Sequence, residues 1–206
     1  MKRQEIFEQS LIMINELRIE LYESNTIDCG VRLELAKDCV CISIEHGDVV
    51  RLLLASDYPI QAMVLLRSQY EAVVKSYWIM FIATNEQVSR LNFNWTNEEQ
   101  KLKDKFPMVS EMLNLLDNAN LDVRHIIKQL KEFKEYNLNP LNSFVHTGKH
   151  SFIRNSVGFD EDFIIKLTAF SNNLATTACQ LIFKHTIPDR QKFLVTLHEK
   201  YSDCFA

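Results

Sequence analysis

Apolar residues recur at every third or fourth position over most of the chain, which is the spacing of one face of an α-helix. This pattern predicts long helices over residues 3–23, about 28–56, and from Asp160 to about His185. Residues 59–84 are apolar almost all round, which is typical of a central helix that its neighbours cover. The pattern therefore predicts an all-α fold.

Shorter helices are expected between and after these long ones. Residues 85–107 are rich in polar side chains and are expected to form a loop or a short exposed helix. Asn139 and Pro140 suit the cap and the first position of a short helix, which Gly148 would end at the left-handed C′ position. Together these elements predict one domain over residues 1–206, built as a bundle of about seven to nine helices.

The apolar face expected for the second long helix contains one histidine. Its members follow each other at steps of three and four positions: Val31, Leu35, Cys39, Ile42, His46, Val49 and Leu53. A histidine on such a face is either a core residue with a satisfied hydrogen-bond partner or a member of a polar pocket.

Composition supports the helical prediction and limits the partners. Only four Gly and four Pro occur among 206 residues, whereas all-β folds need many turn residues. The formal net charge is −4. This balance argues against a strongly basic nucleic-acid platform but leaves room for a local basic patch.

Cysteine usage and hydropathy bear on the compartment. The five Cys are odd in number and are not spaced as a disulfide framework, so buried reduced thiols are expected, as in a reducing cytosol. The first residues begin an amphipathic pattern in place of a signal peptide, and no apolar run approaches the roughly 18 residues of a membrane span. We therefore predict a cytoplasmic protein that does not enter membranes.

Several common chemistries lack their motif in this chain. The glycines are too scattered for a phosphate-binding loop, and no serine lies in a glycine-flanked turn. Neither a paired-cysteine motif nor a His-Glu-x-x-His zinc motif occurs. No cofactor is therefore expected.

The first candidate site lies on the most apolar helix. Arg67 and Glu71 are one turn apart, and Tyr70 is adjacent. The charged pair either forms an intrahelical ion pair on a narrow solvated stripe or lines a cleft, because buried charges are costly unless they are paired or used. Tyr70 would be core in the first case and a pocket wall in the second.

The second candidate site follows Pro140. Asn142 and His146 are one turn apart, and Lys149 and His150 come directly after. A neutral imidazole near physiological pH can act as an acid, a base or a ligand. A lone histidine, however, more often satisfies a local hydrogen bond.

His46 connects the two candidate sites in one hypothesis, in which it shares a polar pocket with Arg67, Glu71 and His146. His46, His146 and Glu71 would also match a metal site of two histidines and one carboxylate. Nothing in the spacing requires such a site, so no metal is predicted.

Several of these segments resemble an uncharacterised bacterial domain family of unknown function. The resemblance rests on the helix with His46, on Leu66–Glu71 with Trp78 beyond, and on Leu141–Gly148, and it covers roughly residues 30–185. That family is similar, more distantly, to the HEPN superfamily of helical proteins. Many HEPN proteins are RNA-cleaving toxins or defence effectors that work as dimers with paired Arg and His residues at the interface. The resemblance thus implies a HEPN-like bundle, a homodimer, and RNA or a nucleotide as partner.

One departure from HEPN nucleases affects the implied chemistry. Those enzymes carry an Arg a few residues before the catalytic His, where this chain has Leu141, while Asn142 and His146 match the polar residue and the His. Either the nuclease chemistry is lost, or Arg67 supplies the cation from another helix, oriented by Glu71. Metal-independent cleavage of RNA through its own 2′-hydroxyl would use His146 as base and Arg67 to stabilise the phosphorane.

Two functions are therefore open. In the first, a HEPN-like protein acts on RNA or a nucleotide in a defence or toxin context, with Arg67, Glu71 and His146 as catalytic residues. The binding residues would be His46, Tyr70, Asn142, Lys149 and His150. In the second, the chain is a non-catalytic binding or scaffolding protein whose polar cluster only orders the bundle or binds a small anion. The resemblance and the charges on core-like helices motivate the first function, and the missing Arg and the acidic net charge motivate the second, so the two have about equal weight.

Overall fold

The fold is given by a computed structural model, which describes residues 3–25, 30–91, 106–186 and 190–206. The regular elements within these ranges are helices, which confirms the predicted all-α bundle. No helix there is both long enough and apolar enough to cross a bilayer. In chain order the elements are α1 (Arg3–Glu23), α2 (Val31–Ala55), α3 (Pro59–Phe81), α4 (Asn85–Leu91), α5 (Val109–Asn118), α6 (Arg124–Phe133), the π-helix η1 (Lys134–Leu138), α7 (Asn139–Val145), α8 (Lys149–Val157), α9 (Glu161–Phe183), α10 (Gln191–Lys200) and the 3-10 helix η2 (Ser202–Cys204).

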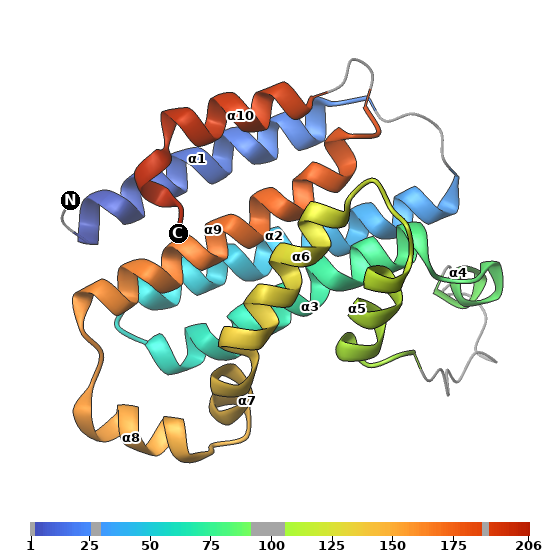
Figure 1. Ribbon diagram of the computed structural model, residues 1–206. Helices are drawn as coiled ribbons and strands as arrows, with labels where there is room; N and C mark the ends of the chain where they lie inside the picture. Colours follow the sequence, from blue (N-terminus) through green and yellow to red (C-terminus); the bar gives the residue numbers. More distant parts are fainter. Residues whose placement is uncertain (1–2, 26–29, 92–105, 187–189) are drawn as a thin grey trace, which may run out of the picture.

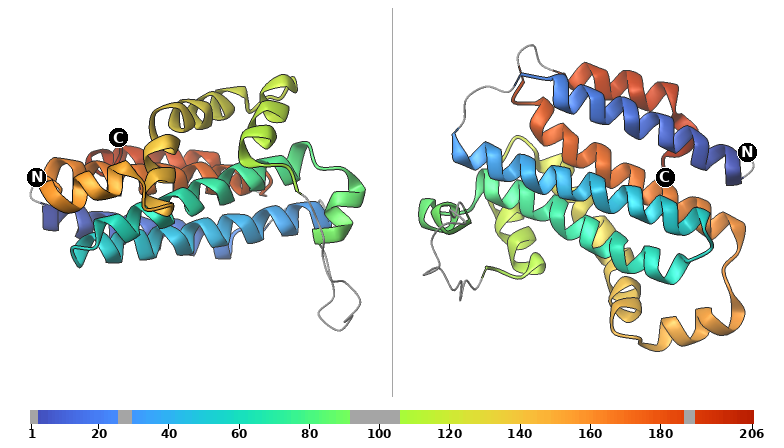
Figure 2. Two further views of the ribbon diagram at one scale, coloured as in Figure 1. Left: turned by 90° about the horizontal axis from the view of Figure 1, so that it is seen from below. Right: turned by 180° about the vertical axis from the view of Figure 1, so that it is seen from behind.

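Helix α9 lies in the middle of the bundle. It packs against α1, α2, α3 and α10, and Figure 1 shows α1 and α10 running side by side above it. Helices α5 and α6 form a further layer in front of α3 and α9, as the view from below in Figure 2 shows. At the lower edge of the molecule α7 packs against α3, and α8 follows α7.

The polar stretch predicted over residues 85–107 begins with α4. This short helix is largely exposed and buries Val88 alone. The part of the stretch from 92 to 105 lies outside the described residues. The prediction of a short exposed helix is therefore confirmed for its first turns.

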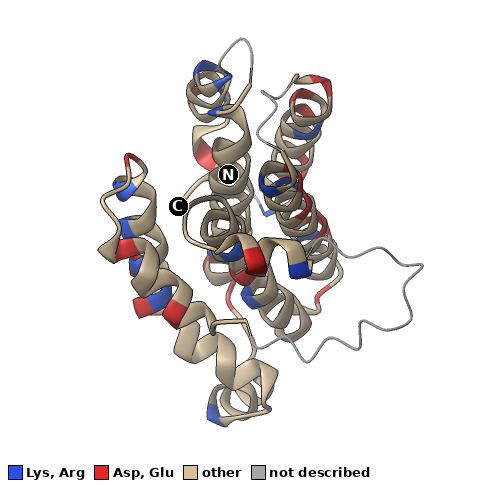
Figure 3. Ribbon diagram, turned by 90° about the vertical axis from the view of Figure 1, so that its right-hand side faces the viewer, with Lys and Arg blue, Asp and Glu red and all other residues tan. Residues whose placement is uncertain are grey.

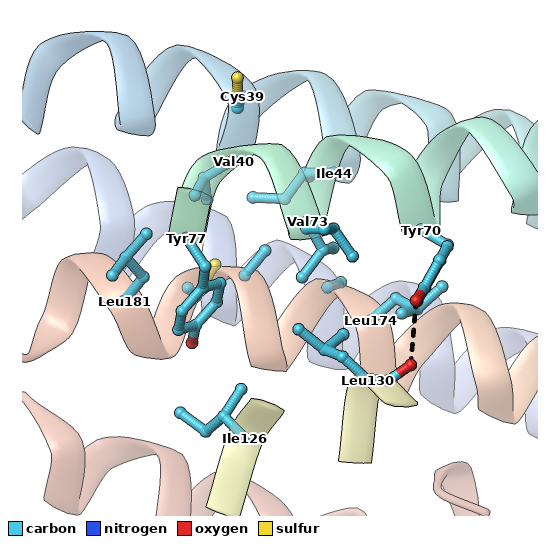
Figure 4. Close-up of a cluster of buried hydrophobic side chains, with 14 of the residues drawn as sticks. Cys39, Val40, Ile44, Tyr70, Val73, Tyr77, Ile126, Leu130, Leu174 and Leu181 are labelled. Atoms are coloured by element: carbon cyan, nitrogen blue, oxygen red, sulfur yellow. Dashed lines mark hydrogen bonds between the residues drawn. The ribbon is translucent and has the colours of Figure 1, made fainter. Parts of the chain in front are cut away.

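Helix α3 is the central helix that its apolar pattern predicted. Tyr70 and Tyr77 are completely buried, and Figure 4 shows both among aliphatic side chains of the neighbouring helices. The Tyr70 hydroxyl donates to the carbonyl of Leu130 at 3.0 Å, and the Tyr77 hydroxyl donates to that of Thr177 at 2.9 Å. Burial raises the pKa of both phenols. Each hydroxyl therefore remains a donor that ties α6 or α9 to α3.

The face that α2 buries differs from the predicted one. In the predicted stripe Val31, Ile42 and Val49 are exposed and His46 is only half-buried. The buried face runs along a neighbouring stripe, which consists of Leu33, Ala36, Cys39, Val40, Ser43, Ile44, Gly47, Val50, Arg51 and Leu54. Hydropathy alone missed this stripe because it contains small and polar residues, which let α2 approach both α3 and α9 closely.

Gly47 marks the closest approach. A Cβ atom at this position would lie 2.8 Å from Nε2 of Gln69 on α3 and 3.2 Å from Oγ of Ser171 on α9. These two side chains also bond to each other. Ser171 Oγ donates to Gln69 Oε1 at 2.8 Å, and Gln69 Nε2 donates to the Ser171 carbonyl at 2.9 Å. Absence of a side chain at Gly47 thus leaves room for a polar bridge between α3 and α9.

Arg51 is buried one turn further along and links several elements. Its guanidinium donates to Asp48 at 2.6 Å and to Asn172 at 3.3 Å. Asn172 Nδ2 donates in turn to Ser10 Oγ at 2.8 Å and to the Cys204 carbonyl at 2.9 Å. Burial lowers the pKa of Arg51, and the Asp48 carboxylate opposes this effect. These bonds join α1, α2, α9 and η2, so we interpret the cluster as a structural network.

The described cysteines have free thiols. Cys39, Cys179 and Cys204 are buried and Cys41 is half-buried. Desolvation raises the pKa of the Cys39 thiol to about 11, so this thiol is protonated and unreactive at neutral pH. The prediction of buried thiols is confirmed for Cys39, Cys179 and Cys204, whereas Cys41 is only half-buried and Cys29 lies outside the described ranges.

Candidate functional site

Arg67 and Glu71 form an ion pair within α3. Their side chains approach to 3.0 Å and are 23% and 37% exposed. The geometry matches the simpler of the two readings, an intrahelical pair on a partly solvated stripe. One feature departs from it, because Nε of Arg67 is buried and has no hydrogen-bond partner among the described residues.

The other predicted residues surround the turn between α7 and α8. His146 is the C-cap of α7 and is exposed, as are Lys149 and His150 at the start of α8. Asn142 is half-buried, and its Oδ1 atom is buried without a hydrogen-bond partner in the described part of the chain. Ser143 organises the turn, since its Oγ accepts from the His150 backbone N–H at 3.0 Å.

The backbone of this turn corrects the predicted role of Gly148. Thr147 has a φ of 52°, in the left-handed region that β-branched residues rarely adopt. The N–H of Gly148 donates to the Ser143 carbonyl at 2.6 Å, and that of Thr147 donates to the Phe144 carbonyl at 3.4 Å. This is a Schellman motif in which Thr147, and not Gly148, occupies C′. Gly148 is required for space, since a Cβ there would lie 2.6 Å from Ser143 Oγ.

The structure brings the helices of the two candidate sites together without joining their charged groups. Helix α3 packs against α7, but within the described residues no hydrogen bond or ion pair connects Arg67 or Glu71 to His146. His46 lies on α2 and takes part in none of these contacts. No group of three or more described His, Cys, Asp or Glu residues is arranged to hold a metal ion. A pocket shared by His46, Arg67, Glu71 and His146 therefore stays a prediction.

A large groove lies elsewhere, between α6, α9 and α10. Its volume is about 1020 Å³, and the side chains that line it come from residues 129–137, 170–180 and 191–206. Figure 1 shows α6 below α9 in the view and α10 above it. A groove of this size is at the upper end of the range for small-molecule sites.

Aromatic rings give the groove a rigid wall. Phe133 stacks on buried Tyr70 with ring centroids 4.9 Å apart, and it meets Phe170 edge-on at 5.9 Å. On another side His198 stacks on Phe205 at 4.3 Å. The π-helix η1 follows Phe133 directly, and π-helical turns occur frequently at functional sites. Tyr70, predicted as a binding residue, thus supports the groove from behind.

The polar lining is mostly uncharged. Helix α9 presents Asn173, Thr176, Thr177 and Gln180 to the groove. These residues follow one another at steps of three, one and three and so share one helix face. The charged lining residues are Glu132 and Glu199, since neither Lys nor Arg is among the described side chains that line the groove.

Sequence reasoning missed this groove. None of the predicted site residues lines it, because each lining segment by itself has the pattern of an ordinary amphipathic helix. One signal was present. The stripe from Asn173 to Gln180 places uncharged polar residues on a helix that is otherwise strongly apolar and buried.

The fold and the groove define an all-helical bundle with an open, carboxylate-bearing cleft. The profile of DUF6988, a family of unknown function, matches residues 40–206, so the chain belongs to this family. No curated protein and no solved structure matches the chain.

Proposed function

We propose that the protein is a non-catalytic binding protein whose ligand lies in the groove between α6, α9 and α10. The observation that carries the proposal is the groove itself, with a volume of about 1020 Å³. Its aromatic wall and its scattered polar groups are the combination that small-molecule sites use for burial and for orientation. Phe133 is held by its stack on buried Tyr70, so this part of the wall is formed before a ligand arrives.

The predicted catalytic cluster supports this binding role better than a catalytic one. A base and a cation that act together must reach the same reacting atoms. Arg67 is paired with Glu71 on its own helix at 3.0 Å, which partly neutralises the cation. His146 is an exposed capping residue. The polar cluster is thus accounted for by local structure.

Filling the groove tests the proposal. Thr176 lines the groove on α9, and a Thr176→Trp substitution would occupy its interior. The matched control is Thr196→Trp, because Thr196 is exposed on α10 and is not a lining residue. The measurement is titration with Nile red, a neutral dye that fluoresces in apolar pockets.

We expect wild type and Thr196→Trp to bind the dye equally, and Thr176→Trp to bind it at least about fivefold more weakly. Circular dichroism of each variant shows that it is folded. Absence of dye binding by the wild type, or equal binding by the folded Thr176→Trp variant, would reject the groove as a binding site.

The HEPN-like function on RNA remains a second candidate because two buried polar atoms lack a hydrogen-bond partner in the described part of the chain. Arg67 Nε, a donor, and Asn142 Oδ1, an acceptor, are both buried without a partner among the described residues, on helices that pack together. Such atoms are costly to leave unsatisfied. The HEPN-like alternative would use this region of α3 and α7 in acting on RNA, with His146 as base and Arg67 as cation.

Expression of the wild type beside Arg67→Ala and His146→Ala tests this alternative. Cleavage of RNA or toxicity that both substitutions abolish would favour it. An inert wild type, with variants that differ only in stability, would contradict it. The HEPN-like alternative also needs a dimer interface, so a strictly monomeric mass at high micromolar concentration would contradict it.

The distribution of charge also bears on RNA binding. Figure 3 shows acidic and basic residues interspersed along the helices, without a basic platform for RNA in that view.

A further inference from the structure

We infer that the groove binds an organic cation, a protonated amine attached to an aromatic or apolar group. This inference rests on the proposed function and adds the chemical class of the ligand. Three properties of the lining support it: the sign of its charges, its side-chain acceptor oxygens and its aromatic rings.

The charges favour a cation. Glu132 on α6 and Glu199 on α10 line the groove from two different elements, and no described Lys or Arg lines it with them. Glu132 does have a basic neighbour, Lys128, but their closest atoms are 3.8 Å apart and both side chains are more than half exposed. Such a pair is weak and screened. An anionic ligand would face both carboxylates without a compensating cation.

The uncharged lining groups offer acceptors. Asn137 Nδ2 donates to the Phe133 carbonyl at 3.1 Å, and Asn173 Nδ2 donates to the Ala206 carbonyl at 3.3 Å. Thr176 Oγ1 donates to the Asn172 carbonyl at 3.1 Å. The Thr176 hydroxyl hydrogen and one hydrogen of each amide are therefore engaged, while each side-chain oxygen keeps acceptor capacity and each amide keeps a second N–H. An ammonium group has three donors and no acceptor, so it complements this lining.

The aromatic rings suit the rest of such a ligand. Phe133 and Phe170 form the edge-on pair at 5.9 Å, and Tyr136 on η1 lines the groove while its side chain is 73% exposed. An ammonium group is attracted to the face of an aromatic ring, and an apolar ligand body packs against it. Exposure of a ring as large as Tyr136 costs hydrophobic free energy that a ligand would recover.

The inference also separates the groove from RNA. Phosphate groups bind where cationic side chains gather, whereas the described lining of the groove has two carboxylates and neither Lys nor Arg. The RNA alternative therefore concerns the α3–α7 region, and the two hypotheses are tested on different residues.

Three probes of one shape test the inference: 2-(2-naphthyl)ethylamine, 2-(2-naphthyl)ethanol and 2-naphthaleneacetate. They differ mainly in charge at neutral pH, so their dissociation constants, measured by calorimetry, isolate the electrostatic preference. We expect the amine to bind about tenfold more tightly than the carboxylate, with the alcohol between them.

A charge-matched pair of variants assigns that preference to the groove. The double variant Glu132→Gln, Glu199→Gln is expected to lower the amine-to-carboxylate preference to about threefold or less. The control is Glu45→Gln, Glu135→Gln, which removes the same net charge from exposed residues that do not line the groove. It should keep the wild-type preference.

Equal or tighter binding of the carboxylate, or an unchanged preference in the Glu132→Gln, Glu199→Gln variant, would overturn the inference. Nile red separates this failure from that of the proposed function. If the dye binds in the groove but the amine does not, the ligand class is wrong and the binding site stands. If neither binds, both are rejected.

Discussion

Thr147 takes a backbone conformation in which a Cβ atom is unfavourable. Its φ of 52° lies in the left-handed region, where an L residue loses roughly 1–2 kcal/mol. Thr147→Gly removes this cost but raises the entropy of the unfolded chain by about 0.4–1 kcal/mol. We therefore expect a net gain in unfolding free energy of about 0.5–1 kcal/mol, measured by urea denaturation.

A helical threonine provides the control for this prediction. Thr196 is exposed and lies away from the ends of α10. Thr196→Gly should therefore lower the unfolding free energy by up to about 1 kcal/mol. A gain in unfolding free energy for Thr147→Gly together with a loss for Thr196→Gly would show that the turn is strained. A loss of stability in Thr147→Gly would contradict the Schellman geometry.

At Gly47 a side chain is excluded by packing. Helix propensity and packing therefore predict opposite changes in stability for a Gly47→Ala substitution. Propensity alone favours Gly47→Ala by about 1 kcal/mol. The new Cβ, however, would lie 2.8 Å from Gln69 Nε2, and overpacking typically costs about 1–3 kcal/mol. We expect a net loss of about 1–2 kcal/mol in thermal or urea unfolding, since the atoms to be displaced belong to the buried bridge between Gln69 and Ser171.

Ser43 is the matched position one turn earlier on the same buried face. Its hydroxyl oxygen is buried without a hydrogen-bond partner among the described residues. Ser43→Ala should therefore leave stability unchanged or raise it by up to about 1 kcal/mol. A Gly47→Ala variant as stable as the Ser43→Ala variant would contradict the close packing of α2 against α3 and α9 at Gly47.

At the scale of helices, sequence periodicity located the elements better than their buried faces. The continuous apolar character of residues 59–84 identified α3 as central, because a helix covered on all sides needs no polar stripe. Helix α2 has apolar residues on two stripes, and the side with Val31, Ile42 and Val49 is the exposed one. Hydropathy could not choose between them, because the decisive residues, Gly47 and Arg51, act through space and hydrogen bonds.

Contact between α1 and α10 gives the stability a pH dependence. Glu16 accepts from Lys200 Nζ at 2.6 Å and from the Tyr201 hydroxyl at 2.7 Å. The hydrogen bond from Lys200 is the largest influence that lowers the pKa of Glu16, with the Tyr201 bond also contributing. A carboxylate whose pKa is lower in the folded state stabilises the fold above its unfolded pKa, near 4.3. That stabilisation is lost as the pH falls through the folded pKa.

Glu16→Gln should therefore be less stable than the wild type at pH 7, by less than about 1 kcal/mol because the pair is partly exposed. This difference should shrink as the pH is lowered below about 4. The control is Glu5→Gln, because Glu5 is exposed on the same helix. A difference between wild type and Glu16→Gln that did not change from pH 7 to pH 3 would contradict the proposed linkage.

For the molecule as a whole, the helical bundle could be predicted from the sequence and the groove could not. Its lining comes from three segments, 129–137, 170–180 and 191–206, and only tertiary packing places them together. The candidate residues Arg67, Glu71 and His146 were selected because charge on an apolar helix is conspicuous in a sequence. A groove lined mainly by uncharged polar side chains and aromatic rings is not conspicuous in a sequence.

The Arg51 network makes the cohesion of the bundle testable, because its members lie on several helices. Arg51→Met leaves Asn172 Oδ1 without its donor, and Asn172→Leu leaves a buried guanidinium nitrogen without its acceptor. A buried donor or acceptor left without its partner costs roughly 1–3 kcal/mol. In the double variant both partners of this hydrogen bond are absent, so neither is left unsatisfied at this contact. The double variant should therefore lose less unfolding free energy than the two single variants lose together, by about 1 kcal/mol or more.

A double-mutant cycle in urea measures this coupling. The control cycle combines Arg51→Met with Thr196→Ala, which shares no hydrogen-bond partner with Arg51, and should be additive within about 0.5 kcal/mol. Additivity in both cycles would mean that Arg51 and Asn172 stabilise the protein independently. Coupling confined to the first cycle would establish that the polar chain from α2 through α9 to α1 and η2 acts as one unit.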